Sequence, residues 1–381
     1  MLRAYFDNNA TTPIAPQVRQ VVVSCLDDTY GNASSIHYFG QSAKQRLEAA
    51  RRQLASLIGA KPAEIVFTGG GTEADNLAIL GVVRGARGSR KHVITTAIEH
   101  PAVLGPFSEL EREGVAVTRL PVGASGVVDP DDVVRALRPE TVLVSVMHAN
   151  NEIGTIQPIA EIAARAHVAV HVDGVQALGK IPVDVNALGV DLYSVSAHKL
   201  YAPKGVGALY VRKGTKLAPL SFGGHHERDR RPGTENVPGI AGFGAAAELA
   251  GHDLIDETNR VASLRDRLER AILERIPETG VNGAASPRTP NTTNIYFDGI
   301  DSEALVIALD LRGFAVSTGS ACSSGAVTPS HVLTAIGLSA ERARASIRFS
   351  LGRFNTAGEI ETLVEALEAS VTHLRRISVH A

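Results

Sequence analysis

Two charged residues in the middle of the chain stand where covalent chemistry is possible. Asp173 ends the apolar run 169–173, and Lys199 follows shortly after the apolar run 192–196. A lysine that is desolvated at the end of a buried strand loses its proton and can attack an aldehyde. A carboxylate in such a place needs a cation or hydrogen-bond donors, because its isolated burial is costly. Taken singly, Asp173 could equally be a helix cap and Lys199 an ordinary surface lysine.

A glycine-rich run adds a third feature. Residues 69–71 are glycines that follow the apolar run 65–68 and lead through Thr72 into a helical stretch. We expect Thr72 to cap this helix, whose N-terminus would offer free amides to an anion. The run is neither the dinucleotide-binding pattern nor a P-loop, and an ordinary capped turn is the alternative. Together with Asp173 and Lys199, it supplies what pyridoxal phosphate needs: an amine, an acid for the pyridine nitrogen and a phosphate site.

The two cysteines have contrasting surroundings. Cys322 lies in the run 317–325, which consists mostly of Ser, Thr and Gly, and such a segment suits a nucleophile that must travel. We expect this loop to be mobile, because little apolar area opposes its conformational entropy. Cys25 is expected to pack in the core, on a helix face shared with Val18, Val21, Val22 and Leu26.

Two further polar residues are placed in or after apolar strands. Arg348 lies inside the run 346–350, where a carboxylate ligand held by two hydrogen bonds would explain its charge. A structural ion pair is the alternative. His100 follows another apolar run and could either stack on an aromatic cofactor or merely satisfy a turn.

The elements that must position these residues alternate between strand and helix. Apolar runs bounded by helical stretches predict a mostly parallel sheet of seven strands, at 65–68, 92–96, 116–120, 142–147, 169–173, 192–196 and 207–211. After about residue 250 a long helix is followed by strands at 294–297, 314–317 and 346–350, with a helix from Ser302 between the first two and a last helix after them. This pattern indicates a second, smaller α+β domain.

Composition narrows the class of protein. The chain has 381 residues, 44% of them hydrophobic and 20% charged, which is typical of a globular protein. A net charge of −2 gives no global attraction to nucleic acid, and we expect no direct nucleic-acid binding. Two cysteines exclude a disulfide framework and a multi-cysteine zinc site. Without a signal peptide or a membrane-spanning run at sequence level, we expect a cytoplasmic protein.

These residues resemble the cysteine desulfurase family, a branch of the fold-type I pyridoxal-phosphate enzymes. The run Ser-Ala-Cys-Ser at 320–323 is similar to that of class I members, which include the enzymes of iron–sulfur assembly. The matches follow one another along nearly the whole chain, at 7–13, 31–37, 70–76, 99–100, 150–154, 171–176, 196–199, 231–236, 319–322 and 346–353.

The resemblance implies an α/β fold with two domains. The large domain would comprise residues 13–255 and bind pyridoxal phosphate on a mostly parallel seven-stranded sheet. The small α+β domain would comprise residues 1–12 and 256–381 and carry the cysteine loop and the substrate arginine.

The resemblance also implies a set of cofactor contacts. Lys199 would hold the cofactor, Asp173 would keep its pyridine nitrogen protonated, Gln176 would donate to its phenolic oxygen and His100 would stack on its ring and take part in catalysis. The remaining positions in the cofactor site would be Gly71, Thr72, Asn151, Ser196, His198 and Thr234, the last reaching the phosphate of a neighbouring subunit in a homodimer.

The reaction implied is removal of sulfur from L-cysteine. Asn151 and Arg348 would hold the substrate carboxylate, and Cys322 would take the sulfur as a persulfide, leaving L-alanine. No metal site is expected in the isolated chain, although Cys322 could share an iron–sulfur cluster with a scaffold partner. The sulfur acceptor stays open among iron–sulfur assembly, tRNA thiolation and DNA modification. The alternative functions are a selenocysteine lyase or β-lyase, and a non-catalytic scaffold of the same fold.

Overall fold

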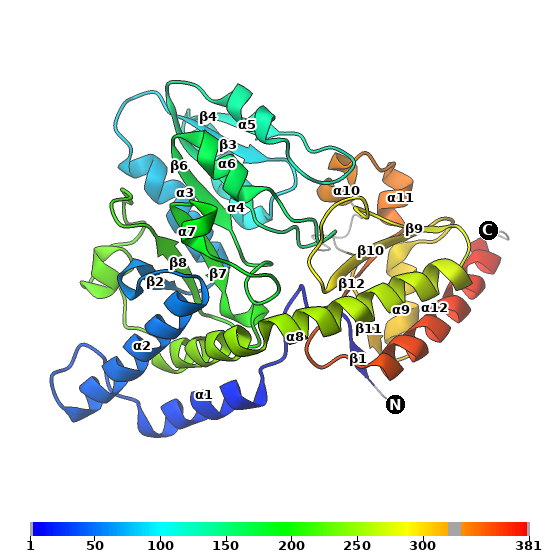
Figure 1. The fold of residues 1–381 in the computed structure, drawn as a ribbon, viewed down its shortest axis with the longest axis horizontal. Coiled ribbons are helices and arrows are strands. Elements are labelled where there is room, and N and C mark those ends of the chain that lie inside the picture. The colour runs from blue at the N-terminus through cyan, green and yellow to red at the C-terminus, as the bar shows by residue number, and fades with distance from the viewer. Residues whose placement is uncertain (1–2, 319–328, 379–381) are drawn as a thin grey trace.

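The computed structural model describes residues 3–318 and 329–378. A seven-stranded sheet forms the centre of the larger part (Figure 1). Its strands run in the order β2-β8-β7-β6-β5-β3-β4, and all neighbours are parallel except the two pairs that involve β8. The strands are β2 (Ile65–Thr68), β3 (His92–Thr96), β4 (Ala116–Leu120), β5 (Thr141–Met147), β6 (Ala169–Asp173), β7 (Leu192–Ser196) and β8 (Gly207–Val211).

Helices cover both faces of this sheet because its strands are apolar on both sides. In β3, Val93 packs with one cluster of buried side chains and the next residue, Ile94, packs with another, as the alternation of a strand requires. The Val93 face is covered by α3 (Gly71–Gly85) and α4 (Pro101–Arg112). The helices that contribute to the opposite cluster include α1 (Pro16–Asp28), α2 (Tyr38–Leu57), α5 (Pro130–Ala136), α6 (Ile159–Ala166), α7 (Val185–Leu188) and the first half of α8 (Val237–Arg275).

The smaller part is built on an antiparallel sheet with the order β12-β10-β9. These strands are β9 (Thr279–Val281), β10 (Thr292–Phe297) and β12 (Ser346–Ser350). A parallel pair, β1 (Ala4–Tyr5) and β11 (Phe314–Ala315), brings the N-terminal segment to the same part. A third buried cluster joins these strands to α9 (Ser302–Asp310), α12 (Ala357–Ser378) and the second half of α8.

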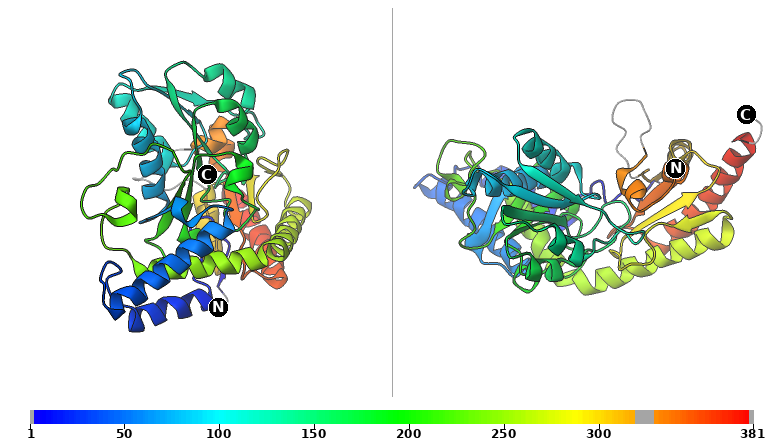
Figure 2. Two further views of the ribbon diagram at one scale, coloured as in Figure 1. Left: turned by 60° about the vertical axis from the view of Figure 1, so that its left-hand side comes forward. Right: turned by 90° about the horizontal axis from the view of Figure 1, so that it is seen from above.

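Helix α8 links the two parts, as Figure 2 shows in both views. Its residues up to Ala250 pack with the large sheet, and those from Val261 onward pack with the small one. The expected boundary at 255/256 falls between them, inside a continuous helix. Two short helices, α10 (His331–Ala335) and α11 (Ala340–Arg344), place Val332 and Ala343 in the cluster of the large sheet. The exact domain division therefore stays a prediction.

The predicted fold class is confirmed, with small differences in the elements. The expected strand at 314–317 is shorter, because only Phe314 and Ala315 form a ladder with β1, while Ser317 makes an isolated bridge to Arg348. Strand β8 is the antiparallel member of an otherwise parallel sheet.

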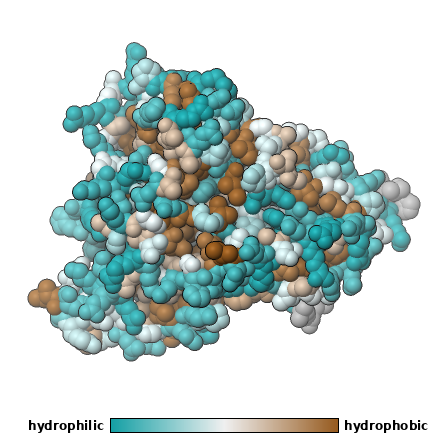
Figure 3. Space-filling view, viewed as in Figure 1, coloured by the Kyte–Doolittle hydropathy of each residue, from teal (hydrophilic) through white to brown (hydrophobic). Residues whose placement is uncertain are grey.

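The surface facing the viewer in Figure 3 is mostly hydrophilic, with apolar side chains gathered near the middle of the view and on a protrusion over the loop between α1 and α2. Within residues 3–318 and 329–378, every helix is too short or too polar to cross a membrane.

Candidate active site

A cavity of about 270 Å³ lies at the carboxyl ends of β5, β6 and β7. Parallel strands end at one edge of a sheet, and ligands of α/β proteins bind there. Its wall contains nine of the residues predicted from the sequence to act in the site: Gly71, Thr72, His100, Asn151, Asp173, Gln176, Ser196, His198 and Lys199. The structure thus brings together residues from several separate stretches of the predicted motifs.

Lys199 is held against the N-terminal segment. It ends a short 3₁₀ helix directly after β7, and its amine donates to the backbone oxygen of Ala10 at 2.8 Å and to that of Asn9. Burial, together with the nearby charge of Arg348, lowers the pKa of Lys199 to about 8. The unprotonated amine, which a nucleophile requires, is therefore far more abundant at neutral pH than in an ordinary lysine.

Asp173 is a buried carboxylate that faces few donors. It accepts one hydrogen bond from the backbone N–H of Val175, at 3.0 Å. Burial and the neighbouring carboxylate of Asp75 raise the pKa of Asp173 to about 7, and burial raises that of Asp75 to a similar value. A cation placed in the cavity would stabilise the charged form of Asp173, because nothing else there compensates it fully.

The N-terminus of α3 opens into the cavity without a side-chain cap. The expectation that Thr72 caps this helix is wrong, because Gly70 occupies the cap position and the helix begins at Gly71. A Cβ on Gly71 would lie 2.9 Å from Cγ2 of Val175 and 3.3 Å from Cβ of Ser196, so a larger residue would fill the space above the helix end. Uncapped amides beside the hydroxyls of Thr72 and Ser196 form a cradle suited to phosphate.

His100 caps a helix and also lines the cavity. Its Nδ1 accepts a hydrogen bond from the N–H of Ala102 at 3.1 Å and caps α4, while the residue also lines the cavity. Burial lowers the pKa of His100, although the charge of Asp173 opposes this. The imidazole is therefore a neutral ring fixed at the cavity wall.

The donor set of this cavity fits pyridoxal phosphate. An uncapped helix end provides for the phosphate, an under-compensated carboxylate provides for a protonated pyridine nitrogen, and a lysine with a lowered pKa provides for the aldehyde. Among the described residues no group of three or more His, Cys, Asp or Glu side chains is arranged to hold a metal ion.

Arg348 lies at the edge of this site and already has partners. Its guanidinium donates to Asp7 Oδ1 at 2.7 Å and to the backbone oxygen of Asn151 at 3.0 Å. The ion pair that was the alternative for Arg348 is therefore present. Its Nε is buried and has no hydrogen-bond partner within the described part of the chain.

Two more predicted residues are not placed at the cavity. Thr234 is exposed and lies outside the cavity of its own chain. Cys322 lies outside the described residues. The chain on either side of its segment is tied to the site: Ser317 and Arg348 exchange backbone hydrogen bonds of 3.2 and 2.7 Å, and the hydroxyl of Ser330 donates to Glu152 at 2.5 Å.

Cys25 is buried in α1, as expected, and burial raises the pKa of its thiol. Leu26, which was expected on the same apolar face, is 61% exposed, so this part of the expectation is wrong. Cys25 is therefore a poor candidate for nucleophilic chemistry.

Sequence reasoning missed several polar residues in and around the cavity. Asn9 accepts from Lys199 and Gln176 through its backbone oxygen, and Lys180 donates to both Asn9 and Gln176. Asp75 also lines the cavity, and its charge acts on Asp173. Asn9 and Asp75 lie inside motifs that carry the family resemblance, and Lys180 comes four residues after Gln176, which are the signals that could have found them.

Comparison with known proteins places this architecture in a family. The aminotransferase class-V family model matches residues 4–363. The cysteine desulfurase IscS of Dictyoglomus turgidum is 49% identical over 377 residues, covering 98% of this chain and 96% of that protein. Among solved structures, a NifS-like protein has a TM-score of 0.91 at 36% identity and covers 98% of this chain and 100% of its own. SspA in complex with cysteine has a TM-score of 0.81 at 36% identity, with coverage of 92% and 99%.

The fold and site define a fold-type I pyridoxal-phosphate-dependent enzyme. The chain belongs to the aminotransferase class-V family and, within it, to the cysteine desulfurases.

Proposed function

We propose that this chain removes sulfur from L-cysteine through the cavity described above, with Lys199, Asp173 and the N-terminus of α3 holding pyridoxal phosphate and Cys322 receiving the sulfur. The observation that carries the proposal is that Lys199, Asp173 and the N-terminus of α3 all line one cavity. The solved relative that holds cysteine supports the choice of substrate.

Different residues of the cavity would bind the cofactor and remove the α-proton of the substrate. Thr72, Ser196 and His198 hold the phosphate beside the amides of Gly71. Asp173 would pair with the pyridine nitrogen, Gln176 would donate to the phenolic oxygen and His100 would stack on the ring. When bound, pyridoxal phosphate supplies an electron-withdrawing ring that stabilises negative charge on the substrate's α-carbon. Lys199 would hold the aldehyde of the cofactor, and its lowered pKa would let the free amine act as the base for the α-proton of the substrate.

Substrate orientation falls to Arg348 and Asn151. A guanidinium carries five N–H donors, and the bonds to Asp7 and to the backbone of Asn151 account for two of them, so Arg348 has further donors for a charge-assisted hydrogen bond to the substrate carboxylate. Asp7 holds the other end of the guanidinium and keeps it in place. Arg348 can therefore form the ion pair with Asp7 and bind the substrate carboxylate at the same time.

The sulfur step balances without an added oxidant. The thiolate of Cys322 attacks the substrate sulfur, an S–S bond forms and the C–S bond breaks. The substrate carbon gains the electron pair and then a proton, which gives alanine, while Cys322 is oxidised to a persulfide. The backbone bonds of Ser317 and the contact of Ser330 with Glu152 support this role, since they tie both ends of the segment to the site.

A homodimer completes the proposed phosphate site. Thr234 is exposed and outside its own cavity, as expected for a residue that serves a second subunit. A group of exposed rings where the loop after α1 leads into α2, in which the ring centroids of Tyr30 and Phe39 lie 5.3 Å apart, supports an interface on this part of the protein. Light scattering is expected to show a dimer, and an active monomer would contradict this element.

The acceptor is a cytoplasmic sulfur-acceptor protein, either an iron–sulfur scaffold or a thiolation enzyme. With a scaffold as partner, Cys322 would be able to act as a ligand of an iron–sulfur cluster shared between the two proteins. Pull-down of partners after loading with cysteine distinguishes these acceptors.

Alanine formation tests the proposed function. Protein loaded with pyridoxal phosphate is expected to release alanine from L-cysteine, and Cys322→Ser is expected to lose this activity. Cys25→Ser is the matched control, because it changes the other cysteine and leaves the cavity intact. Full activity of Cys322→Ser would favour a lyase that needs no enzyme thiol, and no activity in the unaltered protein would favour a scaffold.

A further inference from the structure

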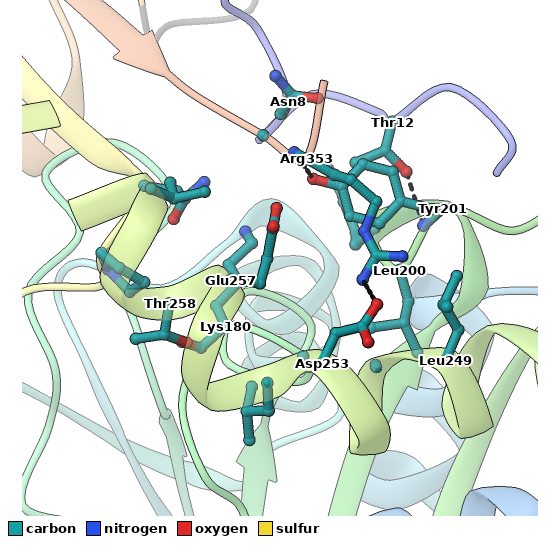
Figure 4. A pocket seen from close by; sticks show the side chains of 18 of the residues that line it. Asn8, Thr12, Lys180, Leu200, Tyr201, Leu249, Asp253, Glu257, Thr258 and Arg353 are labelled. Carbon is teal, nitrogen blue, oxygen red and sulfur yellow. Dashed lines mark hydrogen bonds and ion pairs between the residues drawn. The ribbon is translucent and has the colours of Figure 1, made fainter. Parts of the chain in front are cut away.

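Lys180 is a half-buried lysine behind the site that the proposed function does not use. It lines a second cavity of about 40 Å³ on the far side of Lys199. Figure 4 shows Lys180 close to Glu257 and Thr258 of α8, with the ion pair of Arg353 and Asp253 farther to the right.

The amine of Lys180 points to two amide side chains. It donates to Oε1 of Gln176 at 2.5 Å and to Oδ1 of Asn9 at 3.0 Å. Burial and the nearby charges of Lys199 and Arg348 lower the pKa of Lys180 well below its usual value. A lysine that buries its amine without a carboxylate partner is costly, so its position calls for a local explanation.

The contact determines how the amide of Gln176 is turned. Lys180 donates, so the oxygen of Gln176 faces it and the nitrogen faces the other way. Nε2 of Gln176 accordingly donates to the backbone oxygen of Asn9 at 3.0 Å. An amide nitrogen carries two hydrogens, so Gln176 keeps one N–H for a ligand in the cavity that it lines.

Asn9 depends much less on Lys180. Its Oδ1 also accepts from Asn291 at 2.9 Å, and its Nδ2 donates to Thr292 at 2.8 Å and to the backbone oxygen of Asn151 at 3.0 Å. Loss of Lys180 leaves Asn9 with these partners, whereas the oxygen of Gln176 is left without its donor. The effect of Lys180 therefore falls mainly on Gln176.

We propose that Lys180 is a positioning residue that orients the amide of Gln176, so that an N–H and not a carbonyl oxygen is offered to the phenolic oxygen of pyridoxal phosphate. The inference rests on the cofactor role given to Gln176 in the proposed function. It adds a residue that touches neither cofactor nor substrate and acts through another side chain.

A double-mutant cycle on cofactor binding tests this inference. The variants are Lys180→Met, Gln176→Ala and their combination, prepared without cofactor and titrated with pyridoxal phosphate. Lys180→Met is expected to weaken binding about tenfold, the effect of a misdirected hydrogen bond. The visible absorption maximum of the bound cofactor is expected to move in the same direction as in Gln176→Ala. The double variant is expected to differ little from Gln176→Ala, because Lys180 acts through that residue.

The control is Thr258→Val, which removes a hydroxyl that donates to the backbone oxygen of Lys180 at 3.0 Å without touching Gln176. It is expected to leave affinity and spectrum unchanged. The melting temperature of the cofactor-free variants shows whether each is folded. If Lys180→Met does not fold, Lys180→Gln replaces it, and its shorter polar side chain is expected to give intermediate readings.

Wild-type affinity and spectrum in the Lys180 variants would overturn the inference, as would effects of Lys180 and Gln176 that simply add. Neither reading uses cysteine. If the Lys180 inference fails, the desulfurase proposal is therefore unaffected. If the protein forms no alanine, the desulfurase proposal is contradicted, but the measured cofactor affinity and absorption spectrum are unaffected.

Discussion

The two sheets of the molecule bring their functional side chains to the site in different ways. In the large sheet, Asp173 and Ser196 are the last residues of β6 and β7, and Lys199 follows directly. In the small sheet, Arg348 is the middle residue of β12, opposite Asn294 of β10. Parallel strands end at a common edge, whereas an antiparallel sheet offers a face. The edge gathers the residues proposed to hold the cofactor, and the face supplies the long side chain of Arg348 from the other part of the molecule.

This difference predicts that variants will separate by sheet. Changes at the edge of the large sheet are expected to affect cofactor binding, and changes on the face of the small sheet are expected to affect the substrate. The predictions below test that separation, beginning with the largest effect.

Replacement of Lys199 by alanine is expected to have the largest effect. Its amine is the one lysine amine lining the cavity within the described residues, so turnover is expected to fall by at least about three orders of magnitude. The yellow colour of the bound cofactor is expected to be lost as well. Absorption spectra and alanine assays measure the two effects, and desulfuration at a normal rate would contradict the assignment.

Replacement of Asp173 by alanine is expected to follow closely. The variant loses the carboxylate proposed to pair with the pyridine nitrogen, so both cofactor affinity and turnover are expected to fall, turnover by about a hundredfold or more. Equilibrium dialysis against pyridoxal phosphate measures the first effect. Unchanged absorbance and rate would show that the buried carboxylate only caps the following turn through Val175.

Replacement of Arg348 by alanine is expected to raise KM for cysteine by about one to two orders of magnitude, because a charge-assisted hydrogen bond contributes roughly 1.5–3 kcal/mol. Cofactor affinity is expected to stay the same, in contrast to the edge residues. Asp7→Asn is the matched control, since it removes the ion pair and keeps the guanidinium. Equal loss of stability in both variants with no change in KM would support a purely structural pair.

The pH dependence of cofactor binding tests whether the pKa of Lys199, at the edge of the large sheet, is lowered. Because the pKa of Lys199 is lowered to about 8, the unprotonated amine is abundant above pH 8 and becomes scarcer below it. The rate of cofactor capture by cofactor-free protein is expected to fall about tenfold per pH unit below 8. Stopped-flow absorbance measures this rate. A midpoint near 10.5 would indicate a lysine that burial does not perturb.

Replacement of Cys25 by serine is expected to have the smallest effect on activity. The residue is buried in α1 and lies outside the cavity, so turnover is expected to be unchanged. Stability is expected to fall by about 1–3 kcal/mol, because a hydroxyl replaces a thiol in a buried place. Urea unfolding measures this loss, and a loss of turnover would show that α1 influences the site.

The comparison of the sheets also explains what could be predicted from sequence. Apolar runs mark where parallel strands end, so the order of residues along the chain is enough to place Asp173 and Lys199 at one edge. The partner of Arg348 could not be predicted in this way, because Asp7 lies 341 positions away and reaches it through a pairing of two parts of the fold. The contact of Lys180 with Gln176 is local, but these residues lie in irregular backbone where helical spacing gives no guide.

The cap of α3 shows a limit of a different kind. Thr72 has the side chain of a good cap, yet Gly70 takes that position and leaves the helix end open. Propensity favours a capped end, and the cavity requires an uncapped one. Helix-capping preferences therefore give a wrong prediction at a helix end where a ligand is proposed to bind.

The central claim is that sulfur passes from cysteine to Cys322, and mass spectrometry after one turnover without an acceptor tests it most directly. The peptide that contains Cys322 is expected to gain the mass of one sulfur atom, and the peptide that contains Cys25 is expected to stay unmodified. Sulfur found only on Cys25, or alanine formed in equal amount with no sulfur on Cys322, would contradict the account.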